Sequence, residues 1–258
     1  MNIDWETVRA AVWRQHKGAL RAVMSVDPVA LDSLVGIEAQ KTELCRNTER
    51  FLSRLPANNA LLWGARGTGK SSLIKAVLNE YAAEGLRLIE VFKTDLYHLP
   101  DIVDEIRHLP FRFIVYCDDF SFDVNDNSYV ALKTLLEGSI EQAPDNVLLY
   151  ATSNRRHLVP ESMQDNRDSH VVGDEVHYAD AIEEKISLSD RFGLWLSFYP
   201  PTEDGYLVIV DSYFPNYPGD RQVLHKAAKD FARARGSKSG RTARQFFNAY
   251  SVDCFSNG

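Results

Sequence analysis

Short apolar segments of strand length recur through the middle of the chain, separated by stretches with helical spacing. Each segment is apolar at nearly every position, as expected for a strand buried on both faces of a parallel sheet. Strands that alternate with helices in this way are typical of an α/β fold. The predicted strands are Asn59–Trp63, Leu86–Phe92, Phe111–Cys117, Val147–Ala151 and Gly193–Phe198. The pattern therefore predicts a five-stranded parallel sheet with helices on both faces.

The pair Pro200–Pro201 separates this pattern from the end of the chain. Beyond it, apolar residues recur only at helical spacing, near residues 203–213, 220–234 and 241–250. At the other end, residues 1–30 form a polar, tryptophan-containing segment that we expect to be helical. The predicted organisation is an N-terminal helical extension over 1–30, an α/β domain over 31–200 and a small all-helical domain over 201–258.

One glycine-rich segment carries the strongest chemical signal. Residues 64–71 read GARGTGKS, which matches the phosphate-binding pattern G-x-x-x-x-G-K-[ST] at every position. Its glycines let backbone N–H groups point at phosphate oxygens, while Lys70 reaches the β- and γ-phosphates and the Ser71 hydroxyl binds Mg²⁺. A predicted strand precedes the segment and a predicted helix follows it, which favours this P-loop over a plain glycine-rich turn. The residues predicted to bind ATP are Gly64, Ala65, Arg66, Gly67, Thr68, Gly69, Lys70, Ser71 and Ser72.

Polar residues end the third and fourth predicted strands. Asp118 and Asp119 follow Cys117, and Asn154 follows the fourth strand. Open parallel sheets place their ligand crevice at the carboxyl ends of the strands. There Asp118 would hold Mg²⁺ directly or through water, Asp119 would polarise the attacking water, and Asn154 would hold that water beside the γ-phosphate. Ordinary turns also contain such residues, but their common edge with the P-loop favours catalytic roles.

Three arginines in the second half of the chain are further candidates. Arg191 lies just before the fifth predicted strand, where a surface ion pair with Asp190 is the alternative to a catalytic role. Arg241 and Arg244 are three residues apart and so share nearly one face of the last predicted helix. Ordinary solvated charges are the alternative for both.

Charge and composition restrict the class of protein further. The 258 residues carry a formal net charge of −7, which argues against a protein that coats nucleic acid through bulk charge. Residues 161–190 are strongly acidic and residues 219–244 strongly basic, and each stretch is either a partner-binding surface or a solvated face. No apolar run approaches the roughly 18 residues of a membrane span. The three cysteines are too widely spaced for a disulfide framework, so we expect a cytoplasmic protein without membrane association.

The order of these features resembles AAA+ ATPases over about residues 31–250. That order is a P-loop, a strand ending in paired acids, a strand ending in asparagine, an arginine before the fifth strand, and Gly-x-x-x-Arg near the C-terminus. Segments such as NALLWGARGTGKSS, YCDDFSF and EEKISLSDRFGLWLSF look like one bacterial AAA+ family of unassigned function. The resemblance implies an AAA+ P-loop NTPase core followed by a helical lid, and a ring-like homo-oligomer such as a hexamer.

The resemblance also implies roles for the matched residues. Arg191 would be an arginine finger that acts on ATP held by a neighbouring subunit. Asp119 stands where most members of the superfamily have glutamate, and its shorter side chain would place the carboxylate farther from the water. The remaining implied roles are the adenine border for Val35, Gly36 and Ile37, the sensor-one position for Asn154 and the sensor-two position for Arg244.

Three functions fit these features. The first is a Mg²⁺-dependent ATPase that remodels or loads an unidentified protein partner, and the second is a low-turnover ATP-dependent switch or adaptor. The third is a P-loop kinase, which the C-terminal lid with its own arginines disfavours. Nucleic acid stays open as a partner through the basic stretch, although Phe231 is the only aromatic residue in it. Tyr97 is the only candidate for an aromatic pore loop, so threading of polypeptide is not supported.

Overall fold

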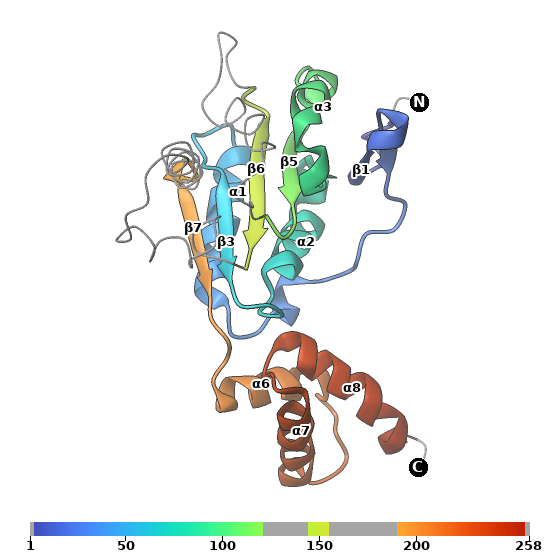
Figure 1. Ribbon diagram of the computed structural model, residues 1–258, viewed down its shortest axis with the longest axis vertical. Coiled ribbons are helices and arrows are strands. Elements are labelled where there is room, and N and C mark those ends of the chain that lie inside the picture. The colour runs from blue at the N-terminus through green and yellow to red at the C-terminus, as the bar shows by residue number, and fades with distance from the viewer. Residues whose placement is uncertain (1–2, 121–143, 155–189, 256–258) are drawn as a thin grey trace, which may run out of the picture.

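The computed structural model in Figure 1 describes residues 3–120, 144–154 and 190–255. The strands are β1 (Ala10–Arg14), β2 (Ala19–Ala22), β3 (Ala60–Gly64), β4 (Leu86–Glu90), β5 (Arg112–Cys117), β6 (Val147–Ser153) and β7 (Leu194–Phe198). The helices are α1 (Glu38–Leu52), α2 (Lys70–Tyr81), α3 (Leu99–Ile106), α6 (Glu203–Tyr213), α7 (Arg221–Arg235) and α8 (Gly240–Phe255). Short 3₁₀ helices cover Gln15–Lys17, Leu31–Ser33, Ala82–Glu84 and Lys93–His98.

These strands form one sheet in the order β2-β1-β4-β5-β6-β3-β7. Neighbouring strands are parallel, except for the antiparallel pair of β1 and β2. β3 lies between β6 and β7, so the strand order reverses around it. In an open α/β sheet, such a switch point places the ligand crevice at the carboxyl ends of the strands. The predicted α/β fold is confirmed, and all five predicted strands are present.

The N-terminal segment differs from the prediction. Residues 10–22 contain two strands where a helical extension was predicted, so the sheet has seven strands and not five. The hairpin turns through a short 3₁₀ helix and Gly18, whose φ is 53°. β1 pairs with β4, whose outer edge would otherwise expose unpaired backbone N–H and C=O groups. Pairing with that edge outweighs the helical preference of the alanines in β1.

Helices cover both faces of the sheet (Figure 1). Alternate residues of β5 point to opposite faces, with Phe113 and Val115 on one side and Ile114 and Tyr116 on the other. α1 and α2 pack on the side of Ile114, whereas α3 packs on the side of Phe113 together with Trp13. Both faces of the central strands are therefore buried, which explains their nearly continuous apolar sequences.

Helices α6, α7 and α8 form a separate bundle below the sheet in Figure 1. The bundle has its own core, which includes Tyr206, Phe214 and Phe246. α6 begins after the proline pair, where the side chain of Thr202 accepts a backbone N–H from the first turn. The three predicted C-terminal helices are present, while the domain boundary between residues 200 and 201 stays a prediction.

The structure describes the basic stretch over residues 219–244 but almost none of the acidic stretch over 161–190. Apart from Asp190, the acidic residues 161–190 lie outside the described part of the chain. The basic stretch lies on α7, the start of α8 and their connection, and part of its charge is paired within the bundle. Lys229 and Lys238 contact Glu203 at 2.9 and 3.0 Å, and Arg233 contacts Asp230 at 3.1 Å. Across the described residues, no helix has the length and apolar character needed to cross a membrane.

Candidate nucleotide-binding site

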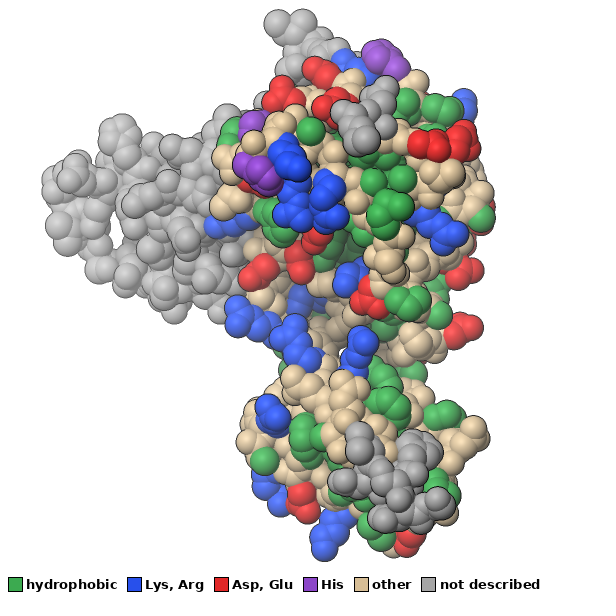
Figure 2. Space-filling view, turned by 90° about the vertical axis from the view of Figure 1, so that its right-hand side faces the viewer, with side chains coloured by type: hydrophobic (Ala, Val, Ile, Leu, Met, Phe, Trp, Pro, Cys, Tyr) green, Lys and Arg blue, Asp and Glu red, His purple; other side chains and the backbone are tan. Residues whose placement is uncertain are grey.

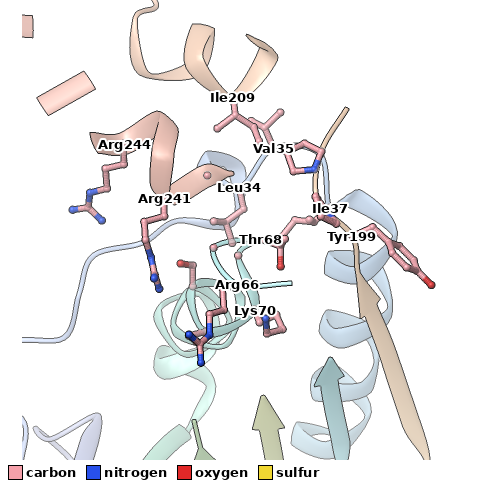
Figure 3. Close-up of a pocket in the computed structure, with 18 of the residues that line it drawn as sticks. Leu34, Val35, Ile37, Arg66, Thr68, Lys70, Tyr199, Ile209, Arg241 and Arg244 are labelled. Atoms are coloured by element: carbon pink, nitrogen blue, oxygen red, sulfur yellow. The ribbon is translucent and has the colours of Figure 1, made fainter. Parts of the chain in front are cut away.

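A cavity of about 750 Å³ lies where the carboxyl edge of the sheet meets the helical bundle (Figure 3). The core contributes the glycine-rich loop and the ends of β5 and β6, and the bundle contributes α6 and the start of α8. A cavity of this size accommodates a ligand as large as a nucleotide. The predicted site residues that line it are Val35, Gly36, Ile37, Arg66, Gly67, Thr68, Gly69, Lys70, Ser71, Ser72, Asp118, Asp119, Asn154 and Arg244.

Two positions of the loop show why its backbone needs glycine. Gly64 has a φ of 134°, and a Cβ atom there would lie 1.9 Å from the carbonyl oxygen of Phe198. Gly67 has a φ of 77°, and a Cβ atom there would lie 2.9 Å from Oγ of Ser239 in the bundle. Residues with a side chain rarely adopt such backbone conformations. Glycine therefore allows the loop to pass close to both β7 and the bundle.

Lys70 begins α2 and is only 7% exposed. Its Nζ donates to the carbonyl oxygens of Gly64 and Ala65, each at 2.7 Å. A third bond, at 3.3 Å, reaches Oδ1 of Asn154 on the neighbouring strand β6. The ammonium group is thus held at the base of the cavity by backbone oxygens of its own loop.

Asp118 follows β5 and receives two hydroxyl hydrogen bonds. Oγ of Ser71 donates to Oδ1 of Asp118 at 2.9 Å, and the hydroxyl of Thr152 donates to the same oxygen. Desolvation alone would raise the pKa of Asp118, but the hydrogen bonds from Thr152 and Ser71 outweigh it and lower the pKa. The site therefore holds an ionised carboxylate next to the Ser71 hydroxyl, a combination of oxygen ligands that suits Mg²⁺.

Asp119 has a backbone conformation that no strand residue adopts, with a φ of 51°. Its N–H donates to Oγ1 of Thr152 at 3.1 Å, and its carboxylate accepts a hydrogen bond of 2.6 Å from Nδ2 of Asn154. Because Asn154 also accepts a hydrogen bond from Lys70, the three side chains form a continuous hydrogen-bonded chain across the base of the cavity.

Tyr116 gives a separate indication that this corner suits a hydrated metal ion. The residue is 3% exposed, and its hydroxyl makes no hydrogen bond within the described residues, although Ser71 and Asp118 lie near it. Burial and the charge of Asp118 raise the pKa of Tyr116, so the hydroxyl keeps its proton. A buried donor without an acceptor is unfavourable. A water of the Mg²⁺ hydration shell would satisfy it, so the residues present fit this metal.

Arginines from both sides make the cavity positively charged. Burial lowers the pKa of Lys70, and the nearby Arg241 and Arg66 lower it further, against the two aspartates after β5, which raise it. In Figure 3, Arg241 on α8 points toward the glycine-rich loop, whereas Arg244 points away from it. Neither makes a hydrogen bond or ion pair with any residue that the structure describes. Converging cations of this kind suit a polyphosphate.

Apolar side chains line another part of the cavity. Leu34, Val35 and Ile37 come from the segment before α1, and Ile209 comes from α6 (Figure 3). A flat heterocycle is favoured by such apolar surroundings. This arrangement agrees with the predicted adenine border, which stays a prediction.

A sequence comparison identifies the family. Residues 6–253 match the family described as "Protein of unknown function (DUF815)". The chain belongs to this family. The predicted resemblance to a family of unassigned function is confirmed, and the α/β core is followed by a helical bundle, as that resemblance implies. No curated protein matches the chain.

Solved structures of RuvB from Thermotoga maritima are similar in fold to this DUF815 chain. A single-substitution variant has 14% sequence identity and a TM-score of 0.49, with 87% of this chain and 72% of that chain covered. The structure titled "RuvB Holliday junction branch migration motor" has 14% identity and a TM-score of 0.47, with the same coverage. A second variant has 13% identity and a TM-score of 0.49, covering 87% and 73%.

Three predicted site residues of the DUF815 chain lie outside the cavity lining. Gly64 and Ala65 contribute through their carbonyl oxygens, which accept hydrogen bonds from Nζ of Lys70. Arg191 lies just before β7, at the end of the sheet where the parallel strands begin. The glycine-rich loop of the same chain follows β3 and so lies at the opposite end of the strands.

Sequence reasoning missed two residues of the site and left a third undecided. Thr152 lines the cavity and contacts both aspartates, and Tyr116 carries the unpaired buried hydroxyl. Thr152 stands two residues before Asn154 at the end of a predicted strand, so its position was a usable signal. Arg241 was one of two candidates on α8, and its orientation toward the loop emerges only from the fold.

Proposed function

We propose that the protein is a Mg²⁺-dependent ATPase that couples ATP hydrolysis to movement of the helical bundle against the core, and so remodels or loads a protein partner. The observation that carries this proposal is the cavity between core and bundle. It brings together the P-loop, a hydroxyl–carboxylate pair suited to Mg²⁺, a second aspartate bonded to Asn154, and arginines of α8. A ligand held by both walls would link the bundle's position to the state of its phosphates.

Each polar residue has a distinct part in the proposed chemistry. Lys70 and the loop would hold the phosphates, and Ser71 and Asp118 would hold Mg²⁺, which neutralises charge on the phosphate oxygens when bound. Asp119 would accept hydrogen bonds from the attacking water, and Asn154 would orient it. In the present structure Asn154 is bonded to both Lys70 and Asp119. Phosphate binding at Lys70 would therefore compete directly with the Lys70–Asn154 bond.

A low-turnover switch is the second candidate, and one observation favours it. The carboxylate of Asp119 is already bonded to Asn154 at 2.6 Å, and aspartate is one methylene shorter than the glutamate that this position would otherwise carry. Both features hold the carboxylate away from a water molecule at the γ-phosphate. Slow hydrolysis would then leave the ATP-bound form long-lived.

The proposed assembly is a ring of identical subunits in which Arg191 acts on ATP held by a neighbour. β7 pairs in parallel with β3, from Leu194 beside Ala60 to Phe198 beside Gly64. At a rise of about 3.3 Å per residue, β7 spans roughly 13 Å, and Arg191 precedes its first residue, so Arg191 lies at the far end of the strand from the phosphate loop of its own chain. Only another subunit could use it as an arginine finger.

Nucleotide binding measured by calorimetry tests the proposal. Lys70→Ala should weaken ATP binding at least about 30-fold, because truncating a buried charged group in a binding site costs roughly 2 kcal/mol or more. Lys75→Ala is the matched control, since Lys75 lies on the same helix, pairs with Asp27 at 3.3 Å and does not line the cavity. Equal ATP affinity in the wild type and Lys70→Ala would contradict the assignment.

Steady-state hydrolysis separates the two candidates. A motor should turn over ATP with a specific activity that rises with protein concentration as the ring assembles. A switch should bind ATP with the same dependence on Lys70, yet release phosphate far more slowly than typical enzymes, whose kcat is on the order of 10 s⁻¹.

A further inference from the structure

We propose that Thr152 is a positioning residue that sets the geometry of both aspartates through one hydroxyl group, a role that rests on the proposed ATPase function. Thr152 lies on β6, is 1% exposed and contacts three consecutive residues after β5. Its hydroxyl donates to Asp118, its Oγ1 accepts the N–H of Asp119 at 3.1 Å, and its carbonyl accepts the N–H of Phe120 at 2.6 Å.

One hydroxyl can satisfy both aspartates at once. A threonine hydroxyl has a single hydrogen and two acceptor lone pairs. Because the hydrogen is directed to the carboxylate of Asp118, the lone pairs are free to accept from Asp119. The same oxygen atom thereby fixes the distance between the metal-side carboxylate and the backbone of the next residue.

The backbone conformation of Asp119 explains why the site needs the hydrogen bonds of Thr152. Adjacent residues of a regular strand point to opposite faces of the sheet. Asp118 and Asp119 nevertheless line the same cavity, which requires the chain to leave the strand conformation at Asp119. The φ of 51° there is one that residues other than glycine seldom adopt, so it needs support from neighbouring groups. The N–H bond to Thr152 gives that support on the backbone side, and the Asn154 bond gives it on the side-chain side.

Thr152→Val tests the hydroxyl directly, because valine keeps the shape of the side chain and removes the oxygen. ATP affinity without metal should stay within about twofold of the wild type, since the P-loop is intact. The gain in affinity on adding Mg²⁺ should fall about tenfold or more, as for other residues that hold a metal ligand. The kcat should fall by a larger factor than the KM changes, because Asp119 loses its orientation. Calorimetry with Mg²⁺ or with chelator gives the first readout independently of turnover.

Two further variants separate positioning from packing. Thr152→Ser keeps the hydroxyl and should restore both the Mg²⁺ dependence and kcat to within about threefold of the wild type. Thr48→Val is the matched control: Thr48 is fully buried, donates to Leu44 at 2.8 Å and lies on α1 away from the cavity, so both readouts should stay unchanged. If valine at 152 prevents folding, Thr152→Ala should give the same losses.

The outcomes are distinct. A folded Thr152→Val protein with wild-type Mg²⁺ dependence and kcat would overturn the proposed role of Thr152. A Thr152→Ser protein as defective as the valine variant would overturn it too, because packing of the methyl group would then be the cause. If the wild type itself binds no ATP, the proposed function fails instead, and the wild-type titration reveals this before any variant is measured.

Discussion

The two walls of the cavity are built differently. On the sheet side, the polar side chains of the cavity are already hydrogen-bonded to one another: Lys70 to Asn154, Asn154 to Asp119, and Ser71 to Asp118. These bonds hold the groups in place before any ligand arrives. They keep the side chains ordered at the base of the cavity, and a bound phosphate would have to replace the bond between Lys70 and Asn154.

On the bundle side, Arg241 and Arg244 make no hydrogen bond or ion pair with the described part of the chain. The bundle is joined to the core through the Pro200–Pro201 connection, and Figure 2 shows Lys and Arg side chains gathered at the narrow waist between the two bodies. The difference indicates a division of roles. In the proposed function, the sheet wall would hold the phosphates with side chains that are already ordered, whereas the arginines of the bundle wall would gain partners when the ligand binds.

In the proposed ring, a neighbouring subunit would contribute Arg191 as a third wall of the cavity. Substituting this arginine should have the largest effect on kcat. Arg191→Ala should bind ATP within about twofold of the wild type but lose on the order of 10³ in kcat, because an always-charged guanidinium stabilises charge that develops during transfer. Arg46→Ala is a control, since Arg46 is 65% exposed on α1 and pairs with Glu43. Phosphate release at several protein concentrations measures the effect.

Mixing two inactive variants tests the shared site itself. Arg191→Ala retains the P-loop, and Lys70→Ala retains the arginine, so mixed rings should recover activity that neither variant has alone. An inactive mixture, with subunit exchange confirmed by fluorescence energy transfer, would contradict an active site shared between two subunits.

Within the sheet wall, substitutions of the two adjacent aspartates should have different effects. Asp118→Asn should reduce the Mg²⁺-dependent part of ATP affinity at least about tenfold, because the metal loses an anionic oxygen. Asp119→Asn should leave binding nearly unchanged and lower kcat by roughly 10² or more, in the range of a lost acid–base group. Calorimetry and steady-state kinetics on both variants distinguish the roles. Parallel losses of binding and turnover in the two variants would show that the wall acts as a single unit.

The bundle wall makes a smaller contribution. Arg241→Ala should weaken ATP binding about tenfold, or about 1.4 kcal/mol, because Arg241 points toward the loop and charge-assisted bonds have this strength. Arg244→Ala serves as its internal control and should change affinity by no more than about threefold. The reverse ranking would return the nucleotide contact to Arg244, as the resemblance to AAA+ ATPases implies.

The smallest expected effect is on the stability of the bundle, through the ion pairs of Glu203. Hydrogen bonds from Lys229 and Lys238 lower the pKa of Glu203 to about 2 from its ordinary 4.5. A lowered pKa contributes stability above the ordinary value, and this contribution is lost as the pH falls from about 4.5 toward 2. Because these ion pairs are exposed to solvent, Glu203→Gln should lower Tm by no more than about 2 °C at pH 7, and by less near pH 3. Asp204→Asn, in the same first helical turn, is the control, and a pH-independent difference in Tm would contradict the ion-pair explanation.

Much of the sheet wall of the cavity was predictable because its features are encoded locally. The eight residues from Gly64 to Ser71 carry the backbone freedom, the cation and the hydroxyl in one uninterrupted pattern. Asp118 and Asn154 were predictable because apolar strands that end in a polar residue mark the ligand edge of a parallel sheet.

The remaining features depend on which strands become neighbours. Thr152 reaches Asp118 and Asp119 only because β5 and β6 pair with Cys117 beside Ala151, a register that no local pattern specifies. The N-terminal hairpin was wrongly predicted as helix for the same reason, since its strand character comes from the open edge of β4. The preference for Arg241 over Arg244 likewise requires the position of the bundle.

The position of β3 in the sheet also determines when the site can form during synthesis. β3 lies between β6 and β7, and both of these strands follow it in the chain. The N–H of Ala65 donates to the carbonyl of Phe198 at 3.1 Å, so the start of the phosphate loop is supported by a residue more than a hundred positions later. A nascent chain that stops before β7 has the full P-loop sequence but lacks the strand that supports it. Contacts between such distant segments slow folding, because a long loop must close before they form. Nucleotide binding should therefore appear late on the ribosome, only after residue 198 has emerged, and ATP in the cell would stabilise completed chains and not their precursors.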